Sequence, residues 1–374
     1  MAIDHAKYMA LALRLAAKGR GEVEPNPMVG TVIVKNGKII STGHHRYYGG
    51  PHAEVYALKS AGKAARGATL YVTLEPCAHF GKMPPCVDAV IEAGIREVII
   101  ATHDPFPKVN GKGIRKLRAA GVKVVEGVLA AEALRLNAGY FKRISTGMPW
   151  VIAKWAMTLD GKIAAYTGDS RGISSEETLR YAHRLRAQVD GVIIGINTVL
   201  RDDPLLNIRY WRRKNASPED YQPTRIILDS RCRLPLDSKI AETARWAETL
   251  MAVSKSAPAA KIKRLRAAGI EVLPFGKSKS KVDIVALLRH LGGEREFTNV
   301  LIEGGAEVLA DAFEKGVVDE VRVIIAPKIL AGRTAVTAVG GTGIAKVADA
   351  LPLKGLKISR LGPDTLITGQ ISGK

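Results

Sequence analysis

Apolar residues in the first part of the chain recur with two periods that alternate along the sequence. Between residues 4 and 18 the spacing is helical and ends at Gly19, which predicts a glycine-capped helix. The runs 29–34 and 38–42 flank Asn36-Gly37, a dipeptide typical of a two-residue hairpin turn. The same two periods predict further helices and strands. The helices are expected at 53–61, 85–93, 114–120 and 137–147, and the strands at 68–74, 97–101 and 122–125. Helices that alternate with short strands predict a three-layer α/β domain.

The breakers Gly147-Met148-Pro149 interrupt this pattern. We therefore expect one domain over residues 1–147 and a second over residues 148–374. Alternation resumes in the second part, which predicts another α/β domain. Its strands are expected at 150–157, 191–195, 224–229, 271–274, 299–303 and 320–326, and its helices at 259–268, 283–291 and 306–315. Residues 210–222 are polar and aperiodic, which predicts a surface loop.

Composition narrows the class of protein. The 374 residues, 47% hydrophobic and 25% charged, are typical of a soluble globular chain with two cores. No secretory signal and no apolar run of membrane length is visible, so we expect a cytoplasmic protein with no membrane partner. Three cysteines argue against a disulfide framework. The net charge of +20 would suit nucleic acid or phosphorylated substrates, but few aromatic residues interleave with the scattered basic ones. We therefore do not expect a nucleic-acid groove.

Three residues form a candidate metal site. His52, Cys77 and Cys86 can bind Zn²⁺ and leave a fourth position for water. Glu54 follows the histidine by two residues and can carry a proton from that water to a departing amine. A structural zinc site, or a buried histidine with two inert cysteines, is the alternative. The combination of His-x-Glu at a helix start with Pro-Cys after a strand favours a zinc deaminase.

The two cysteines are separated by residues 78–85, a longer spacing than the Pro-Cys-x-x-Cys of base deaminases generally. This insertion carries His79 and Lys82, which suit a phosphate-bearing substrate. In the second part, Gly304 and Gly305 lie where a strand is expected to turn into a helix. Such a turn lets backbone amides approach a phosphate, although a tight turn without a ligand is common. The absence of Gly-x-Gly-x-x-Gly excludes the usual Rossmann fingerprint.

Several motifs together carry a family resemblance. They are Pro25-Asn26-Pro27-Met28-Val29-Gly30, His45 with His52-Ala53-Glu54, and the segments 75–86, 104–113, 154–164, 198–209, 228–230 and 303–305. With them the chain resembles the bifunctional riboflavin-biosynthesis deaminase–reductase family over nearly its whole length. The resemblance implies an N-terminal cytidine-deaminase-like three-layer α/β domain followed by a dihydrofolate-reductase-like α/β domain. Met83, Phe106 and Gly172 depart from the residues usual or frequent in that family.

The resemblance also implies roles for individual residues. In the first domain it implies one Zn²⁺ on His52, Cys77 and Cys86, with Glu54 as the proton shuttle. Its deaminase substrate contacts would be Asn26, His45, His79 and Lys82. In the second domain it implies NADPH contacts at Ala156, Gly172, Thr198, Asp202, Ser230, Gly305, Ala306, Glu307, Val308, Leu309, Ala310 and Asp311. Its reductase substrate contacts would be Ser170, Arg186, Leu206, Arg209 and Glu303, with Lys154 and Glu303 as candidates near the reduced carbon.

The substrate implied by the resemblance is 2,5-diamino-6-ribosylamino-4(3H)-pyrimidinone 5′-phosphate. We expect its hydrolytic deamination, followed by NADPH reduction of the ribosyl chain to a ribityl chain. The resemblance further implies a homo-oligomer, either a dimer or a tetramer. One alternative is a tRNA base deaminase with an accessory domain, which the +20 charge favours and the long Cys–Cys spacing and reductase motifs disfavour. Another is a non-catalytic protein with a structural zinc, which Glu54 beside the ligands disfavours.

Overall fold

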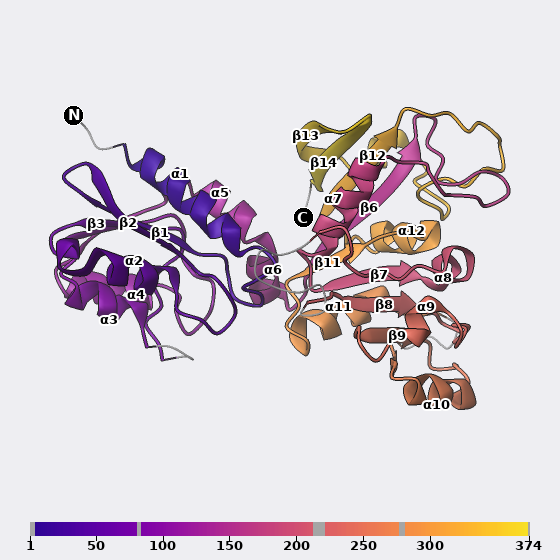
Figure 1. The fold of residues 1–374 in the computed structure, drawn as a ribbon, viewed down its shortest axis with the longest axis horizontal. Helices are drawn as coiled ribbons and strands as arrows, with labels where there is room; N and C mark the ends of the chain where they lie inside the picture. The colour runs from indigo at the N-terminus through magenta and orange to yellow at the C-terminus, as the bar shows by residue number, and fades with distance from the viewer. Residues whose placement is uncertain (1–3, 81–83, 212–220, 277–280, 373–374) are drawn as a thin grey trace. The chain divides into compact units, whose positions relative to one another are not determined.

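The computed structural model describes residues 4–80, 84–211, 221–276 and 281–372. The chain divides into two compact units, Met1–Gly147 and Met148–Lys374, and each is described by itself (Figure 1). Among the described residues, no helix is both long and apolar enough to cross a membrane. Part of the loop expected at 210–222 lies outside the described residues.

The first unit is built on a five-stranded sheet in the order β2-β1-β3-β4-β5. The hairpin β1–β2 and the pair β1–β3 are antiparallel, whereas β3–β4 and β4–β5 are parallel. The strands are β1 (Gly30–Lys35), β2 (Lys38–His44), β3 (Thr69–Val72), β4 (Glu97–Ile100) and β5 (Lys123–Glu126). The helices are α1 (His5–Ala16), α2 (Ala53–Ala61), α3 (Cys86–Glu92), α4 (Lys112–Ala119), α5 (Ala130–Leu136) and α6 (Ala138–Thr146).

Helices cover both faces of this first sheet. Residues of α1 and α5 share a core cluster with one face, and residues of α2, α3 and α4 share a cluster with the other face. The helix α2 lies directly against the hairpin, because a Cβ on Gly43 would be only 2.2 Å from the carbonyl oxygen of Ala53. This close approach sets the position of the first turn of α2, which carries Glu54. The order of elements agrees with the expected three-layer α/β domain, with α5 as an additional helix.

The second unit contains a nine-stranded sheet in the order β10-β9-β8-β7-β11-β6-β12-β14-β13. Strand pairs from β10 to β12 are parallel, and β14 and β13 pair antiparallel at one edge. The strands are β6 (Trp150–Thr158), β7 (Gly191–Gly195), β8 (Thr224–Leu228), β9 (Thr249–Val253), β10 (Glu271–Pro274), β11 (Asn299–Ile302), β12 (Glu320–Ala326), β13 (Leu353–Leu361) and β14 (Asp364–Ile371).

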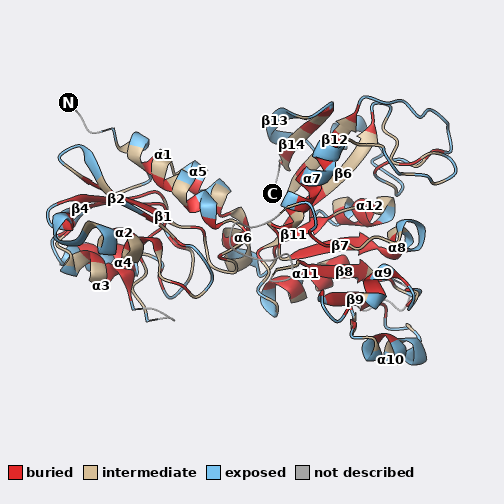
Figure 2. Cartoon of the chain, viewed as in Figure 1, coloured by how far each residue is buried: buried red, intermediate tan, exposed pale blue. Residues whose placement is uncertain are grey.

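Two groups of helices sandwich the second sheet. The first group packs on one face and consists of α7 (Glu176–Arg186), α8 (Ile196–Asp202), α9 (Lys239–Glu242) and α10 (Ala259–Ala267). The second group packs on the other face and consists of α11 (Ile284–Gly293) and α12 (Ala306–Glu314). Figure 2 shows the central strands β7, β8 and β9 buried between these layers. The mixed α/β class expected from the sequence is confirmed for both units.

Some elements of the second unit were not expected from the sequence. They are β9, α7, α8, α9 and the edge hairpin β13–β14. A start signal for α7 is nevertheless present, because the hydroxyl of Ser175 accepts a hydrogen bond from the backbone of Thr178 and two glutamates follow it. Residues 114–124 and 262–272 are similar in sequence, and they form two similar units, α4–β5 and α10–β10, each joined through a glycine with positive φ.

An arginine is buried in the core of the second unit, and the described residues offer it no carboxylate partner. Arg225 on β8 is fully buried, and its guanidinium donates to the hydroxyls of Thr243 and Thr249. It also donates to the carbonyl oxygens of Leu205, Ile240 and Ala247, at 3.3, 3.1 and 2.9 Å. Burial lowers the pKa of Arg225 to about 10, so the side chain stays charged at neutral pH. The charge is therefore balanced by carbonyl and hydroxyl dipoles.

We expect Arg225→Met to lower the free energy of unfolding of the second unit by about 3–5 kcal/mol, because several buried acceptors lose their donor. The measurement is urea unfolding of the full chain, followed by a probe of each unit. Arg118→Met on the exposed face of the first unit is the matched control and should change stability by less than about 0.5 kcal/mol. Equal midpoints for wild type and Arg225→Met would contradict this account.

Candidate zinc centre and candidate cofactor pocket

Three elements of the first unit bring the candidate zinc ligands together. His52 is the N-cap of α2, Cys77 follows β3, and Cys86 is the first residue of α3. Their ligand atoms all lie within 4.8 Å of one another. The imidazole Nδ1 of His52 is 3.1 Å from the Cys86 sulfur and 3.6 Å from the Cys77 sulfur. One imidazole and two thiolates in this arrangement fit a tetrahedral zinc ion with one position left for water.

The electrostatics of the cluster favour a thiolate on Cys77. Hydrogen bonds with the Cys86 side chain and with His52 lower the pKa of the Cys77 thiol, and the backbone N–H of Cys86 donates to its sulfur at 3.3 Å. In the absence of a metal ion, the same pairing and burial raise the pKa of Cys86. One proton is thus shared unequally within the pair, as expected for two thiols that a cation would draw together.

Glu54 lies beside the three ligands in the first turn of α2. It is 3% exposed, and burial raises the pKa of its carboxyl to about 7. Its Oε2 atom is buried, and the described residues offer it no hydrogen-bond partner. A buried carboxyl oxygen without a hydrogen bond destabilises the fold unless a bound ligand supplies the missing hydrogen bond. The position therefore fits a group that exchanges a proton with a molecule bound next to the ligands.

Two of the four expected substrate contacts of the first unit lie together. The Nδ1 atom of His45 donates to the carbonyl oxygen of Pro51 at 3.0 Å, so Nε2 can accept from the amide of Asn26 at 3.4 Å. Burial lowers the pKa of His45, which keeps this imidazole neutral. Its ring meets the ring of His52 edge to face, with centroids 5.5 Å apart. Asn26 and His45 thus form one rim of the candidate zinc centre.

The other two expected contacts belong to the loop between the cysteines. His79 has its ring 5.8 Å from the ring of Phe106, and its Nδ1 is buried with no partner among the described residues. Lys82 and the neighbouring Met83 lie outside the described residues.

Sequence reasoning assigned no role to Glu75, although it precedes Pro76-Cys77. Its buried carboxylate accepts from the backbone N–H groups of Gly111 and Gly113, at 2.9 and 3.0 Å, and from Ile114 at 3.3 Å. These are the first amides of α4 and its N-cap, where a negative charge is favourable. Glu75 therefore ties the loop that ends in α4 to the segment that carries Cys77.

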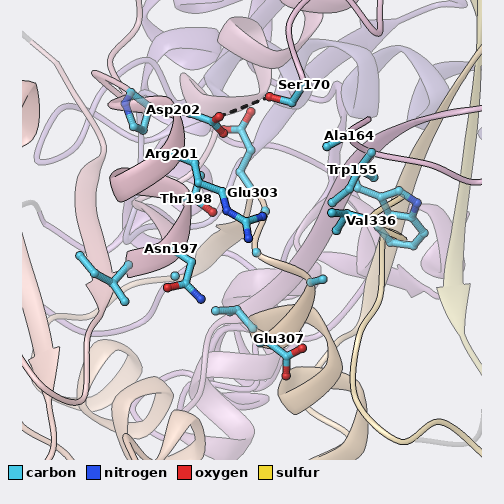
Figure 3. A pocket seen from close by; sticks show the side chains of 18 of the residues that line it. Trp155, Ala164, Ser170, Asn197, Thr198, Arg201, Asp202, Glu303, Glu307 and Val336 are labelled. Carbon is cyan, nitrogen blue, oxygen red and sulfur yellow. Dashed lines mark hydrogen bonds between the residues drawn. The ribbon is translucent and has the colours of Figure 1, made fainter. Parts of the chain in front are cut away.

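The second unit contains a cavity of about 1100 Å³ at the carboxyl ends of its central parallel strands (Figure 3). Its lining runs from the end of β8 to β6, three strand spacings or about 14 Å, which suits an extended ligand. Most residues expected to contact the cofactor or the reductase substrate line this cavity. They are Lys154, Ala156, Ser170, Gly172, Arg186, Thr198, Asp202, Leu206, Ser230, Glu303, Gly305, Ala306, Glu307, Val308 and Asp311.

Three expected residues lie elsewhere. Leu309 is buried in the core cluster between α12 and the sheet, and Ala310 is buried where a Cβ on Gly341 would be 3.0 Å from its own Cβ. Arg209 is exposed outside the lining, and its guanidinium donates to the side chain of Asn207 at 2.6 Å.

The turn from β11 into α12 shapes one wall of the cavity. Gly304 and Gly305 have φ values of 118° and 85°, a region that favours glycine. A Cβ on Gly305 would lie 3.5 Å from the backbone nitrogen of Gly195 and 3.6 Å from the hydroxyl of Thr198. The N-terminus of the nine-residue helix α12, which has no side-chain cap, opens into the cavity beside this turn. This geometry suits a phosphate group of a bound ligand.

A buried ionic cluster lies at the β6 end of the cavity. Glu303 accepts from Lys154 at 3.1 Å and from Nε of Arg186 at 2.6 Å. Burial alone would raise the pKa of Glu303, but Arg186 and Lys154 outweigh it and lower the pKa to about 2. Arg186 also donates to the carbonyl oxygen of Asn207. Each nitrogen of the Arg186 guanidinium therefore donates to a protein oxygen, which leaves this side chain poorly placed to bind a phosphate as well.

The cavity also contains residues that sequence reasoning missed. They include Trp155, Asn197, Arg201, Arg231, Arg233, Lys281 and Val336. Figure 3 shows Arg201 pointing into the cavity, three residues after Thr198 on α8. Residues three apart share a helix face, so the position of Thr198 was a usable signal for Arg201.

Comparisons with known proteins cover both units. Residues 2–102 match the model of the cytidine and deoxycytidylate deaminase zinc-binding region, and residues 149–367 match the model of the RibD C-terminal domain. The chain is 43% identical over 360 residues to the riboflavin biosynthesis protein RibD of Aquifex aeolicus, with 96% of each chain covered. It is 38% identical to the protein of that name from Escherichia coli, covering 96% of this chain and 97% of the relative.

Two solved structures are also similar to this chain over nearly its whole length. One structure of Acinetobacter baumannii RibD matches with a TM-score of 0.87 and 37% identity over 99% of each chain. The diaminohydroxyphosphoribosylaminopyrimidine deaminase/5-amino-6-(5-phosphoribosylamino)uracil reductase of Thermotoga maritima matches with a TM-score of 0.83 and 35% identity over 98% of each chain. The similarity therefore includes the succession of both units.

His183 on α7 supplies a pH prediction for the second unit. Its ring is fully buried, Nδ1 accepts from the backbone of Arg209 at 3.0 Å, and Nε2 has no partner among the described residues. Burial, together with Arg186 and Arg209, lowers the pKa of His183 to about 4. The unfolded chain therefore binds a proton near pH 6.5 that the folded chain binds only near pH 4, so stability falls as pH decreases between these values.

We expect a loss of roughly 1–3 kcal/mol of second-unit stability between pH 6.5 and pH 4 from this residue. His183→Asn keeps an acceptor for the Arg209 amide and should reduce this pH dependence. The measurement is thermal unfolding of both proteins across this pH range, with the first-unit transition as the internal control. An unchanged slope of stability against pH in the variant would show that His183 is not responsible.

Proposed function

The chain belongs to the RibD family, the bifunctional deaminase–reductases of riboflavin biosynthesis, and we propose which of its residues perform the two reactions. The enzyme first deaminates a diaminopyrimidine ribosyl phosphate and then reduces the ribosyl chain of the product. The observation that supports the assignment best is the convergence of His52, Cys77 and Cys86 beside the buried carboxyl of Glu54, whose Oε2 has no hydrogen-bond partner among the described residues. We assign deamination to residues 1–147 and reduction to residues 148–374.

In the first unit His52, Cys77 and Cys86 would hold one Zn²⁺. When bound there, zinc supplies a water whose pKa is lowered to about 7 and is thus a hydroxide source at neutral pH. Glu54 would carry a proton from the attacking water to the departing ammonia at its Oε2, which has no hydrogen-bond partner among the described residues. The amide oxygen of Asn26 would orient the pyrimidine through a hydrogen bond, and the neutral His45, whose ring nitrogens pair with Pro51 and Asn26, would pack beside it. His79 and Lys82, in the loop between the cysteines, bind the phosphate-bearing part of the substrate.

In the second unit the cavity at the strand ends would hold NADPH, with a phosphate at the Gly304-Gly305 turn and Ser230 toward the β8 end. The reduced carbon then lies near Lys154, Ser170 and Glu303 at the β6 end. Because its pKa is lowered to about 2, Glu303 accepts hydrogen bonds at neutral pH and does not supply a proton. Lys154, 3.1 Å away, is therefore the proton-bearing member of the pair.

The remaining parts of this proposal concern partners and location. The substrate is a small phosphorylated pyrimidine, and the family match over residues 149–367 does not favour a tRNA deaminase with an accessory domain. We further propose a cytoplasmic homo-oligomer, either a dimer or a tetramer.

Glu54→Gln tests the proposed deamination. We expect ammonia release from the diaminopyrimidine phosphate to fall at least about a thousandfold, because the amide cannot shuttle a proton. Oxidation of NADPH with the supplied aminouracil ribosyl phosphate should remain at the wild-type rate. The assay measures ammonia without NADPH and then nicotinamide absorbance with it. Glu97→Gln is the control and should retain both activities. Glu97 is also a buried glutamate of the first unit, but it lies at the start of β4. Loss of both reactions in Glu54→Gln would contradict the division of labour.

Arg201 is the cavity cation whose contribution is simplest to test. We expect Arg201→Ala to raise KM for NADPH by about three- to tenfold with little change in kcat, since one charge-assisted contact to a phosphate is lost. Steady-state kinetics with NADPH and NADH would distinguish two phosphates. An equal increase in KM for both cofactors would indicate that Arg201 contacts the pyrophosphate. An increase in KM for NADPH alone would indicate that it contacts the 2′-phosphate. Arg264→Ala on α10, outside the lining, is the control. An unchanged KM would exclude Arg201 from the cofactor site.

A further inference from the structure

A buried asparagine at the junction of α5 and α6 makes an unusual contact with a distant part of the first unit. Asn137 is 3% exposed. Its Oδ1 accepts from the backbone N–H of Met28 at 2.8 Å, and its Nδ2 donates to the carbonyl oxygen of Met28 at 2.9 Å. A primary amide thus pairs with both backbone groups of one residue, as a neighbouring strand would. The two residues are 109 positions apart.

The segment that Asn137 holds carries one rim of the candidate zinc centre. Met28 lies two residues after Asn26 and two residues before β1, and it is buried against Ala16, Val23 and Leu136. The next carbonyl, that of Val29, accepts from the backbone N–H of His45 at 2.9 Å. The side chains of Asn26 and His45 then contact each other at 3.4 Å. Asn26 and His45 therefore both depend on where the backbone at Met28 and Val29 lies.

We propose that Asn137 is a positioning residue for the deamination reaction, which acts on the substrate through Asn26 and His45. The inference rests on the proposed function of the first unit and concerns a residue that is neither a candidate zinc ligand nor an expected substrate contact. His52, Glu54, Cys77 and Cys86 come from α2, the end of β3 and α3. The ligand set is thus held by other elements and meets the rim only where His45 contacts Pro51 and the ring of His52, so a change at Asn137 acts first on Asn26 and His45.

The chemistry of the pair explains why an asparagine is required. Alanine would leave the N–H and the carbonyl oxygen of Met28 buried without partners. Aspartate has nearly the same shape and retains an acceptor for the N–H, but its second oxygen would face the Met28 carbonyl oxygen. The junction itself does not need the side chain, because the backbone of Asn137 bonds separately to Ala133 and to Phe141.

The experiment compares full-length, zinc-replete wild type with Asn137→Ala, Asn137→Asp and Thr69→Val. Thr69→Val removes another buried side-chain hydrogen bond of the first unit, at the end of β3 remote from Cys77, and is the matched control. We expect both Asn137 variants to raise KM for the diaminopyrimidine phosphate about tenfold or more, the equivalent of losing about 1.4 kcal/mol of binding free energy. Values of kcat should remain within about threefold of wild type. Zinc content and the reductase kinetics of the same chains should not change.

A double-mutant cycle with Asn26→Ala tests the route of the effect. If Asn137 acts through Asn26, we expect Asn137→Ala to raise KM clearly less in the Asn26→Ala background than in wild type. Fully additive effects would overturn the proposal. So would a KM equal to that of Thr69→Val, or a parallel loss of zinc and kcat, which would make Asn137 a purely structural residue.

Hydrogen exchange separates failure of this inference from failure of the proposed function. Wild type that releases no ammonia from the diaminopyrimidine phosphate would refute the proposed function. The amides of residues 28–30 should nevertheless exchange faster in both Asn137 variants, and not in Thr69→Val, if Asn137 anchors this segment. Unchanged exchange there would overturn the inference whatever the activity.

Discussion

Both candidate sites depend on one constraint of layered α/β structure: helices begin at the edge of the sheet where parallel strands end. In the first unit this brings together the N-cap of α2, the segment after β3 and the first residue of α3. In the second unit it brings together the ends of β6, β7, β8 and β11 and the start of α12. The contact of α2 with Gly43, where even a Cβ would not fit, makes the first of these arrangements rigid. A site built this way inherits its geometry from the packing of the layers.

Each unit has a glutamate in its candidate site, and the pKa values of the two carboxyls are shifted in opposite directions. Glu54 is buried and Glu303 has a side chain only 8% exposed, and both lie at a strand–helix edge. The pKa of Glu54 is raised to about 7 because its burial is not offset by a nearby cation strong enough to compensate. That of Glu303 is lowered to about 2 because Arg186 and Lys154 contact both of its oxygens. Burial alone therefore says little about the role of a carboxyl, and its immediate partners decide whether it can carry a proton.

The sequence predicted the elements and residues that local patterns encode. Asn36-Gly37, Gly147-Met148-Pro149 and the glycines at 304 and 305 mark turns or breaks by their own backbone preferences, and the structure shows a turn or break at each. The ligand set His52, Cys77 and Cys86 was accessible because each member lies at a start or end of a predicted element. The helical period of α12 could have shown that residues 306–311 cannot all face one cavity, but it could not have identified which of them turn away.

What the sequence could not supply are contacts between residues far apart in the chain. The carboxylate of Glu75 reaches amides 36 to 39 residues away, and the amide of Asn137 reaches a residue 109 positions away. Neither contact can be recognised from a local sequence pattern, because the partner is a backbone group that every residue type carries. Such contacts nevertheless locate the loops between the regular elements, where the groups that meet the substrate lie. The candidate zinc ligands can thus be recognised from local motifs, whereas the placement of the substrate depends on tertiary contacts that only the folded chain reveals.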